Sequence, residues 1–400
     1  MAQPTHVDVD VVVIGAGIIG ASCAYHLSSA GQSVAVLEAR GGYAEGSSGR
    51  SFASVRSQWA DDLSIDLSWN SIRTYQRFEE EHGIDVGYRP TGYLLLWSEE
   101  VWARQLEAVE LQRQHGVPVE VLDPVAAQRF VAFETPGVAG TTFGPQDGRI
   151  DPHIATGAFL DLARGQGASV HFGSPVTAIE NDPDGAWVVH TAKGTVHARH
   201  VVNAAGGWSS ETAALAGISA PVVHSKRNVY ASASGAIDRD IPMTCDMATG
   251  VYMRSDGDRL LFGLSNPRQT DGYDTEVDWD WLENLLTIGT ERFPWLADLP
   301  LDSRACWAGT YENTPDAKPL IGPEPSRPGW IHACGFSGHG VMQAPEVGRL
   351  VAEQVTDGAI TSLDVSSLGP ERFVDGIHGL DMVIWRFNAS RTGCPTEHRC

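Results

Sequence analysis

The chain has 400 residues, of which 42% are hydrophobic and 20% charged, as is typical of a folded globular protein of about two domains. Its 50 acidic and 28 basic residues give a formal net charge of −22, which argues against nucleic acid and anionic membranes as partners. The six scattered cysteines predict neither a disulfide framework nor a metal site. No signal-peptide pattern and no apolar run of roughly 20 residues is present, so we expect no membrane span and a cytoplasmic location.

The N-terminal segment has the pattern of a nucleotide-binding βαβ unit. The run V-D-V-D-V-V-V-I at 7–14 predicts a buried parallel strand, a helix follows, and S-V-A-V-L-E predicts the next strand. In the intervening G-A-G-I-I-G, Gly15 permits a tight turn, Gly17 lets the backbone approach a pyrophosphate, and Gly20 lets helix and strand pack closely. Glu38, ending the second strand, is placed to accept hydrogen bonds from a ribose. These residues predict bound FAD or NAD.

The rest of the chain alternates helices and strands. Helices are expected over 61–82, 99–115, 152–164, 279–293 and 341–355. The third helix is followed by segments with hairpin-like spacing, namely A-S-V-H-F, P-V-T-A-I-E, A-W-V-V-H-T and G-T-V-H-A. Only the strands near Val7, Ser33 and His200 have the pattern of parallel strands, and hairpin strands are expected elsewhere. A second glycine cluster, G-F-S-G-H-G, is either another anion-binding helix start or a plain structural turn.

Seven short motifs follow one another along the chain. They are G-A-G-I-I-G with Glu38, G-S-S-G-R-S, D-G-R-I-D-P, P-V-T-A-I-E, N-A-A-G-G-W, W-A-G-T-Y-E-N-T-P-D and G-F-S-G-H-G. In this order they resemble the D-amino-acid oxidase superfamily of FAD-dependent amine oxidoreductases, over about Val7 to Phe373. The pattern is most similar to the branch of the sarcosine oxidases and dimethylglycine dehydrogenases, with D-arginine-type dehydrogenases nearby.

The resemblance implies an α/β fold class. A Rossmann-like FAD domain of the glutathione-reductase type is interleaved with an α+β substrate domain built on an antiparallel sheet. The FAD domain is expected to comprise 1–86, 150–220 and 318–375, and the substrate domain 87–149 and 221–317. Residues 376–400 are a tail to which the resemblance assigns no role.

The resemblance also assigns the residues that hold FAD. The glycine loop binds the pyrophosphate, Glu38 binds the ribose, and the strip at 47–51 follows the pyrophosphate, the ribityl chain and the flavin ring. The backbone of Val176 contacts the adenine, and Gly338 to Gly340 face the pyrimidine end of the flavin. The expected cofactor-binding set is Gly15, Gly17, Ile18, Ile19, Gly20, Glu38, Ala39, Arg40, Ser47, Ser48, Gly49, Arg50, Ser51, Val176, Ala204, Ala205, Gly206, Trp208, Gly335, Phe336, Gly338, His339, Gly340 and Val341.

Three departures from the family pattern concern covalent attachment of the flavin. Gly309 stands where one-chain sarcosine oxidases carry the attaching cysteine, and the strip G-S-S-G-R lacks the histidine that some relatives use. Ile150 occupies the position of the histidine that binds a second, covalent FMN in multi-subunit sarcosine oxidases. We therefore expect FAD that is bound without a covalent bond.

The expected substrate site contains two arginines and two tyrosines. Arg56 resembles the carboxylate-binding arginine of the one-chain sarcosine oxidases, whose partnering lysine is replaced here by Met342. Arg227 resembles an arginine that contacts the substrate carboxylate in D-arginine-type enzymes, and their second arginine falls near Tyr311. Tyr252 matches a substrate-facing tyrosine. Interdomain salt bridges for the arginines and core positions for the tyrosines are the alternatives.

Two further positions bear on the chemistry. His339 either caps and packs the last helix beside the flavin or transfers a proton. Leu261 stands where oxygen-using sarcosine oxidases place a lysine, and the lack of that cation favours a dehydrogenase over an oxidase.

The first functional hypothesis is therefore an FAD-dependent amine oxidoreductase. It would oxidise a C–N bond of an N-alkylated or D-amino acid by hydride transfer to the flavin, and water would hydrolyse the imine. The electron acceptor, either oxygen or another carrier, and the oligomeric state stay open. The alternatives are a flavoprotein subunit without turnover of its own and an NAD(P)H-dependent flavin hydroxylase.

Overall fold

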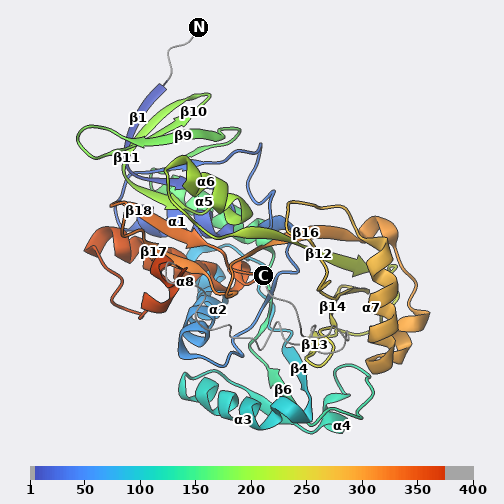
Figure 1. Ribbon diagram of the computed structural model, residues 1–400. Helices are drawn as coiled ribbons and strands as arrows, with labels where there is room; N and C mark the ends of the chain where they lie inside the picture. The colour runs from blue at the N-terminus through green and yellow to red at the C-terminus, as the bar shows by residue number, and fades with distance from the viewer. Residues whose placement is uncertain (1–4, 374–400) are drawn as a thin grey trace, which may run out of the picture.

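The computed structural model describes residues 5–373, which form two large sheets with helices packed around them (Figure 1). The tail at 376–400 therefore lies outside the described residues. Among the helices within 5–373, none combines the length and the apolar character that crossing a membrane requires.

The first sheet contains the βαβ unit that the sequence predicts. Its strands are β1 (Thr5–Ile14), β2 (Val34–Leu37), β8 (Ser169–His171), β9 (Val176–Asn181), β10 (Trp187–Thr191), β11 (Gly194–Asn203), β17 (Leu320–Pro323) and β18 (Trp330–Cys334). The main path runs β17-β18-β11-β1-β2-β8, and the hairpin of β9 and β10 extends from β11. Neighbouring strands from β18 to β8 along this path are parallel.

The expectation of hairpin pairing is wrong for three strands. In the segment A-S-V-H-F, β8 pairs in parallel with β2, because it follows a helix that carries the chain back across the sheet rather than a tight turn. Parallel pairing also joins β18 to β11, and β13 (Met243–Asp246) to β4 (Tyr93–Trp97). The turn at D-P-D-G between β9 and β10 is as predicted.

Three long helices cover one face of the first sheet, namely α1 (Ile18–Ser29), α5 (Pro152–Gly165) and α8 (Gly340–Asp357). A fourth, α2 (Asp62–His82), packs on α8. The helix α1 lies against both α5 and α8 and is buried along most of its length, as expected for a small-residue helix in the middle of a layer. The carboxylate of Asp61 caps α2 at Ser64 N, and that of Asp151 caps α5 at His153 N. On the opposite face, Trp187 and Trp330 pack together near α6 (Ser209–Leu215).

The second sheet supplies one wall of the candidate site. Its remaining strands are β5 (Glu120–Leu122), β6 (Gly140–Gly144), β12 (Val223–Ala231), β14 (Tyr252–Asp256), β15 (Arg259–Gly263) and β16 (Trp307–Asn313). The order is β16-β12-β15-β14-β13-β4-β6-β5. The helix α7 (Trp279–Arg292) packs on it through Trp281 and Leu285. The remaining helices and strands are α3 (Glu99–Gln114), the short α4 (Pro124–Ala127), and the two-stranded ribbon of β3 (Ser54–Val55) and β7 (Gly148–Arg149).

Each sheet draws strands from separated parts of the chain, as an interleaved two-domain protein requires. The expected domain boundaries stay predictions.

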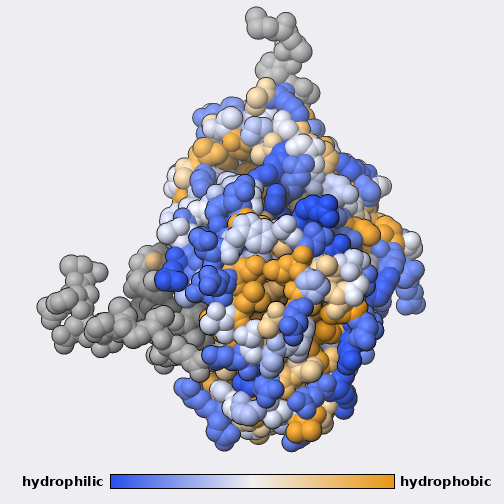
Figure 2. Space-filling model, turned by 90° about the vertical axis from the view of Figure 1, so that its right-hand side faces the viewer, coloured by the Kyte–Doolittle hydropathy of each residue, from blue (hydrophilic) through white to orange (hydrophobic). Residues whose placement is uncertain are grey.

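On the face that lies at the right of Figure 1, where α7 runs, apolar side chains gather within a hydrophilic surround (Figure 2). Trp279, at the start of α7, is 45% exposed.

The contact between α1 and α8 depends on a glycine. A Cβ atom at Gly348 would lie 2.6 Å from the backbone carbon of Ser22, so neither helix could keep its position. We expect Gly348→Ala to lower the free energy of unfolding by about 1–3 kcal/mol, measured by urea denaturation. The control is Gly165→Ala at the end of α5, where nothing lies within 4 Å and the change should be neutral or slightly stabilising. Equal midpoints for the two variants would contradict the close packing.

Candidate functional site

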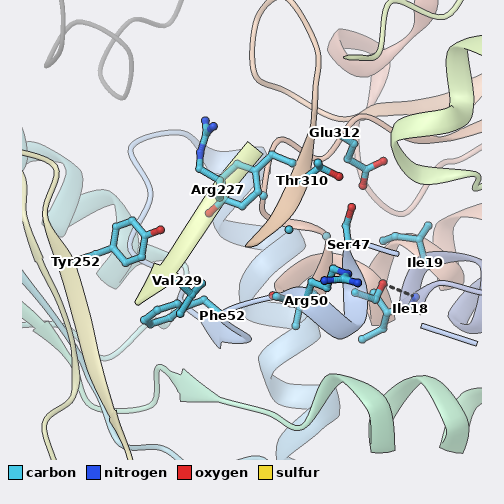
Figure 3. A pocket seen from close by; sticks show the side chains of 17 residues that line it. Ile18, Ile19, Ser47, Arg50, Phe52, Arg227, Val229, Tyr252, Thr310 and Glu312 are labelled. Carbon is cyan, nitrogen blue, oxygen red and sulfur yellow. Dashed lines mark hydrogen bonds between the residues drawn. The ribbon is translucent and has the colours of Figure 1, made fainter. Parts of the chain in front are cut away.

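Two cavities meet between the sheets. The larger, of about 520 Å³, lies at the carboxyl ends of β1 and β2 and has the size of a ligand site. The smaller lies between the strip at 47–52, the strands β12, β14 and β16, and the start of α8 (Figure 3). The two share Ile18, Ile19, Ser47, Ser48 and Glu312. The cavities therefore form one continuous site.

The glycine loop shapes the larger cavity through close backbone contacts. Gly15 has φ +107°, and a Cβ there would overlap the carbonyl of Ala204. A Cβ at Gly20 would overlap the carbonyl of Gly15. The N–H of Ile18, the first residue of α1, donates to Ser48 Oγ (3.0 Å), so the strip is fastened to the helix start.

Glu38 holds two segments of the cavity wall together. Its Oε2 accepts from the N–H of Ala16 (2.8 Å) and its Oε1 from the N–H of Arg40 (2.8 Å). Each carboxylate oxygen keeps a further lone pair, as the predicted contact with a ribose hydroxyl requires. At the same rim, the Arg40 guanidinium lies 5.1 Å from the centre of the Trp208 ring and donates to the Tyr273 hydroxyl (3.0 Å).

Most of the predicted cofactor residues lie on the two cavities. Those on the larger cavity are Gly15, Gly17, Glu38, Ala39, Arg40, Val176, Ala204, Ala205, Gly206 and Trp208. Those on the smaller cavity are Arg50, Ser51, Gly338, Gly340 and Val341, and Ile18, Ile19, Ser47 and Ser48 belong to both. Gly20, Gly49, Gly335, Phe336 and His339 lie behind the walls.

The strip at 47–51 packs tightly against β16. The indole N–H of Trp307 donates to the Arg50 carbonyl (3.0 Å), and Arg50 Nη1 donates to the Ala308 carbonyl (3.2 Å). A Cβ at Gly309 would lie 2.8 Å from the Cβ of Arg50. The resemblance aligns Gly309 with the cysteine that attaches the flavin in one-chain sarcosine oxidases. The segment around Arg50 therefore occupies the space that a side chain at this position would need.

The pairing of β12 with β16 brings the predicted substrate residues Arg227 and Tyr311 together. Arg227 is opposite Gly309, and Ser225 is opposite Tyr311, so these side chains share the cavity face of the sheet. The guanidinium of Arg227 lies 4.7 Å from the centre of the Tyr311 ring, and its Nη1 donates to Ser225 Oγ (2.9 Å). Its buried Nε has no hydrogen-bond partner among the described residues. The Arg227 guanidinium thus lines the smaller cavity and keeps N–H groups that no described residue accepts from.

Aromatic side chains form the opposite wall. The ring of Tyr252 meets that of Phe52 edge to face, with centres 5.2 Å apart. Burial raises the pKa of both Tyr252 and Tyr311, and the nearby charge of Arg227 only partly offsets it. Both phenols therefore stay protonated and can donate a hydrogen bond. Figure 3 shows the side chains of Arg227, Tyr252 and Phe52 around the cavity.

Three predicted catalytic residues lie away from the cavity. The Arg56 guanidinium lies 3.6 Å from the centre of the Trp59 ring, and its Nη1 donates to the Gln58 carbonyl (2.6 Å). His339 packs edge to face on the same Trp59 ring, and burial lowers the pKa of its imidazole to about 3. Met342 lies in the first turn of α8 and is buried in the core. The packing alternative for His339 therefore agrees with its geometry better than proton transfer does.

Glu312 is a site residue that sequence reasoning missed. It lies on β16 inside the motif W-A-G-T-Y-E-N-T-P-D, is 9% exposed, and lines both cavities. The signal was an acidic residue in a strand otherwise built of small, aromatic and amide residues. Val229 and Thr310 also line the smaller cavity without having been predicted.

A mainly parallel sheet with a glycine loop at its edge, joined to a cavity under a mainly antiparallel sheet, is typical of a dinucleotide-dependent oxidoreductase. The family model "FAD dependent oxidoreductase" (DAO) matches residues 10–354, so the chain belongs to this family and its cofactor is FAD. The residues fit that group, because the glycine positions at which a Cβ would meet the wall lie along a cavity of suitable size.

Several known proteins are similar to this chain. Mouse mitochondrial dimethylglycine dehydrogenase is 27% identical over 91% of this chain and 44% of its own length. Bovine FAD-dependent oxidoreductase domain-containing protein 1 is 30% identical over 92% of this chain and 85% of its own. The structure of L-proline dehydrogenase from P. horikoshii superposes with a TM-score of 0.85 at 29% identity, over 93% of this chain and 99% of that one. The chain thus spans less than half the length of the dimethylglycine dehydrogenases that it matches.

The crowding between Gly309 and Arg50 generates a prediction about the cofactor. Residue 309 is a glycine and has no side chain to attach the flavin, and the strip leaves no room for one. We therefore expect FAD to be released intact when the purified protein is precipitated with acid. The absorbance of flavin in the supernatant and in the pellet measures this. Flavin retained in the washed pellet would show a covalent bond at another residue.

Proposed function

We propose that the chain oxidises a C–N bond of an N-alkylated or D-amino acid to an imine, which water hydrolyses. The observation that carries the proposal is Arg227, a cation without a carboxylate partner among the described residues, on a cavity continuous with the dinucleotide site. The relatives support it, since one is named for dimethylglycine and another for L-proline, both amino acids with a substituted nitrogen. The alternatives, a flavoprotein subunit without turnover and a flavin hydroxylase, have no comparable support.

In this proposal, Arg227 binds the substrate carboxylate through its free donors. Phe52, Tyr252 and Tyr311 exclude water and orient the carbon next to the nitrogen. The positive charges of Arg227 and Arg50 on the same cavity lower the pKa of a bound ammonium group, which favours the neutral amine that oxidation requires. When bound, FAD supplies the acceptor for the hydride that leaves this carbon.

The assignment of the cofactor residues follows the cavity walls. We propose that Gly15 and Gly17 hold the pyrophosphate, Glu38 the ribose, and the strip at 47–51 the ribityl chain and the ring. Leu261 is 4% exposed and packs among apolar side chains, and this supports a dehydrogenase that passes its electrons to a carrier other than oxygen.

An anaerobic substrate screen tests the activity. With FAD bound and oxygen removed, we expect sarcosine, dimethylglycine, proline or a D-amino acid to bleach the visible absorbance of the flavin. We expect slow recovery of the absorbance on admission of air and rapid recovery with an artificial electron acceptor. Bleaching by NADPH and by none of the amines would contradict the proposal and favour the hydroxylase.

Arg227 is tested by substitution. Arg227→Ala should raise the amine concentration for half-maximal bleaching roughly 30- to 1,000-fold, because truncating one partner of a buried charge pair costs about 2–4 kcal/mol. FAD content should stay unchanged. Arg56→Ala should have a smaller effect, since Arg56 reaches the site only through its charge. The control is Arg239→Ala, an exposed arginine paired with Asp238 away from the cavities. Equal effects of the variants at 227 and 239 would contradict the role of Arg227.

A further inference from the structure

Glu312 has a buried carboxyl group to which the proposed reaction assigns no role. Its Oε2 accepts a hydrogen bond from the N–H of Gly335 (3.1 Å), and its backbone carbonyl accepts from the N–H of Ser337 (3.0 Å). The side chain therefore fastens β16 to the loop G-F-S-G-H-G. Ser337 in that loop has φ +51°, a conformation that costs energy for a residue other than glycine and that these bonds help to hold.

The carboxyl group also faces the cavities. Its Oε1 would lie 3.7 Å from a Cβ placed on Gly340, and its Oε2 would lie 3.8 Å from one placed on Gly206. The lack of side chains at these two glycines leaves open space around the carboxyl group. In Figure 3 it points toward the hydroxyl of Ser47, across the place where the two cavities join.

No cation within the described residues neutralises this group by an ion pair within 4 Å. The ionisable groups on other elements that share its surroundings are Arg50 and Arg227 in the smaller cavity, His224 opposite on β12, and Cys334 before the loop. The larger cavity adds Glu38, Arg40, Glu45 and Glu211. Burial outweighs the backbone hydrogen bonds and raises the pKa of Glu312 to about 7. Burial also lowers the pKa of His224 and raises that of Cys334 to about 12, so neither titrates between pH 7 and 9.

We infer that Glu312 binds FAD as a neutral carboxylic acid, donating a hydrogen bond to an acceptor on the flavin half of the cofactor, so that FAD binding takes up a proton. Oε2 is engaged by the N–H of Gly335, and the N–H of Phe336 also favours the charged form of the group, but burial outweighs both. Oε1 accepts no hydrogen bond of 3.5 Å or less from the described residues and can carry the proton. The flavin half is favoured because Glu312 lies beside Gly340 on the smaller cavity. A carboxylate has no proton to donate, so it would leave this acceptor on the flavin half without its hydrogen bond.

The inference concerns cofactor binding, and it rests on the proposed function only in requiring FAD. Its consequence is a pH-dependent affinity. Above the pKa of the free carboxyl group, the dissociation constant of FAD should rise about tenfold per pH unit, because deprotonation removes the binding form. Uptake should approach one proton per FAD at pH 8.5. ADP, which lacks the flavin half, should bind with an affinity that does not change between pH 7 and 9.

The experiment measures equilibrium release of FAD on dilution of the full-length holoenzyme between pH 6 and 9, by the recovery of flavin fluorescence. Glu312→Gln keeps a donor and an acceptor but cannot titrate, so we expect FAD to bind with no such pH dependence. The matched control is Glu346→Gln, a buried carboxyl on α8 that pairs with Arg349 outside the cavities and should keep the wild-type slope. Calorimetry of FAD binding in buffers of different ionisation enthalpy counts the protons in the wild type and needs no variant.

Three results would overturn the inference. They are a flat pH profile for the wild type, a slope that persists in Glu312→Gln, and a pH dependence of ADP binding equal to that of FAD. If Glu312→Gln does not fold, the proton count of the wild type decides. Bleaching by an amine together with a flat profile would refute the role of Glu312 and leave the proposed function intact.

Discussion

The site depends on the approach of two backbones at the carboxyl edge of the first sheet. The loop before α1 lies against the carbonyl of Ala204 after β11, and this is possible only because Gly15 and Gly20 carry no side chain. The parallel pairing of β1 with β11 brings residues about 190 positions apart to this contact. The order of the strands in the first sheet therefore determines where the larger cavity forms. The residues that follow the strands ending at that edge line it.

The second constraint is the register of β12 and β16. Arg227 and Tyr311 project from one face of this pair and line the smaller cavity. His224 and Thr310 project from the other face and hydrogen-bond to each other, and Thr310 also reaches the smaller cavity. A slip of one residue would exchange these sets and remove the cation from the cavity. The residues proposed to bind the substrate thus lie mainly on the second sheet, and those proposed to bind the cofactor lie mainly at the edge of the first. The strand β16 contributes a residue, Glu312, to both cavities.

The sequence predicted the parts of the site that depend on local pattern. The roles of the glycine loop and Glu38 can be inferred from spacing and conformational freedom, and that of the strip at 47–51 from the resemblance to the family. The pairing of β8 and the burial of Glu312 could not be inferred, since both depend on contacts between distant segments. Arg56 has the same limitation. Its motif suggests a carboxylate ligand, but only the fold reveals the Trp59 ring beneath its guanidinium.

The crowding at Gly309 constrains how this chain could change over time. A covalent tether to the flavin at position 309 would not arise from one substitution, because the main chain and Cβ of Arg50 occupy the volume that a new side chain needs. The Arg50 segment is itself held by Trp307 and by the carbonyl of Ala308. Acquiring a tether would require coordinated changes in two segments that are far apart in the sequence. The glycine at 309 is in this sense epistatically protected, because its replacement depends on a change in a distant segment.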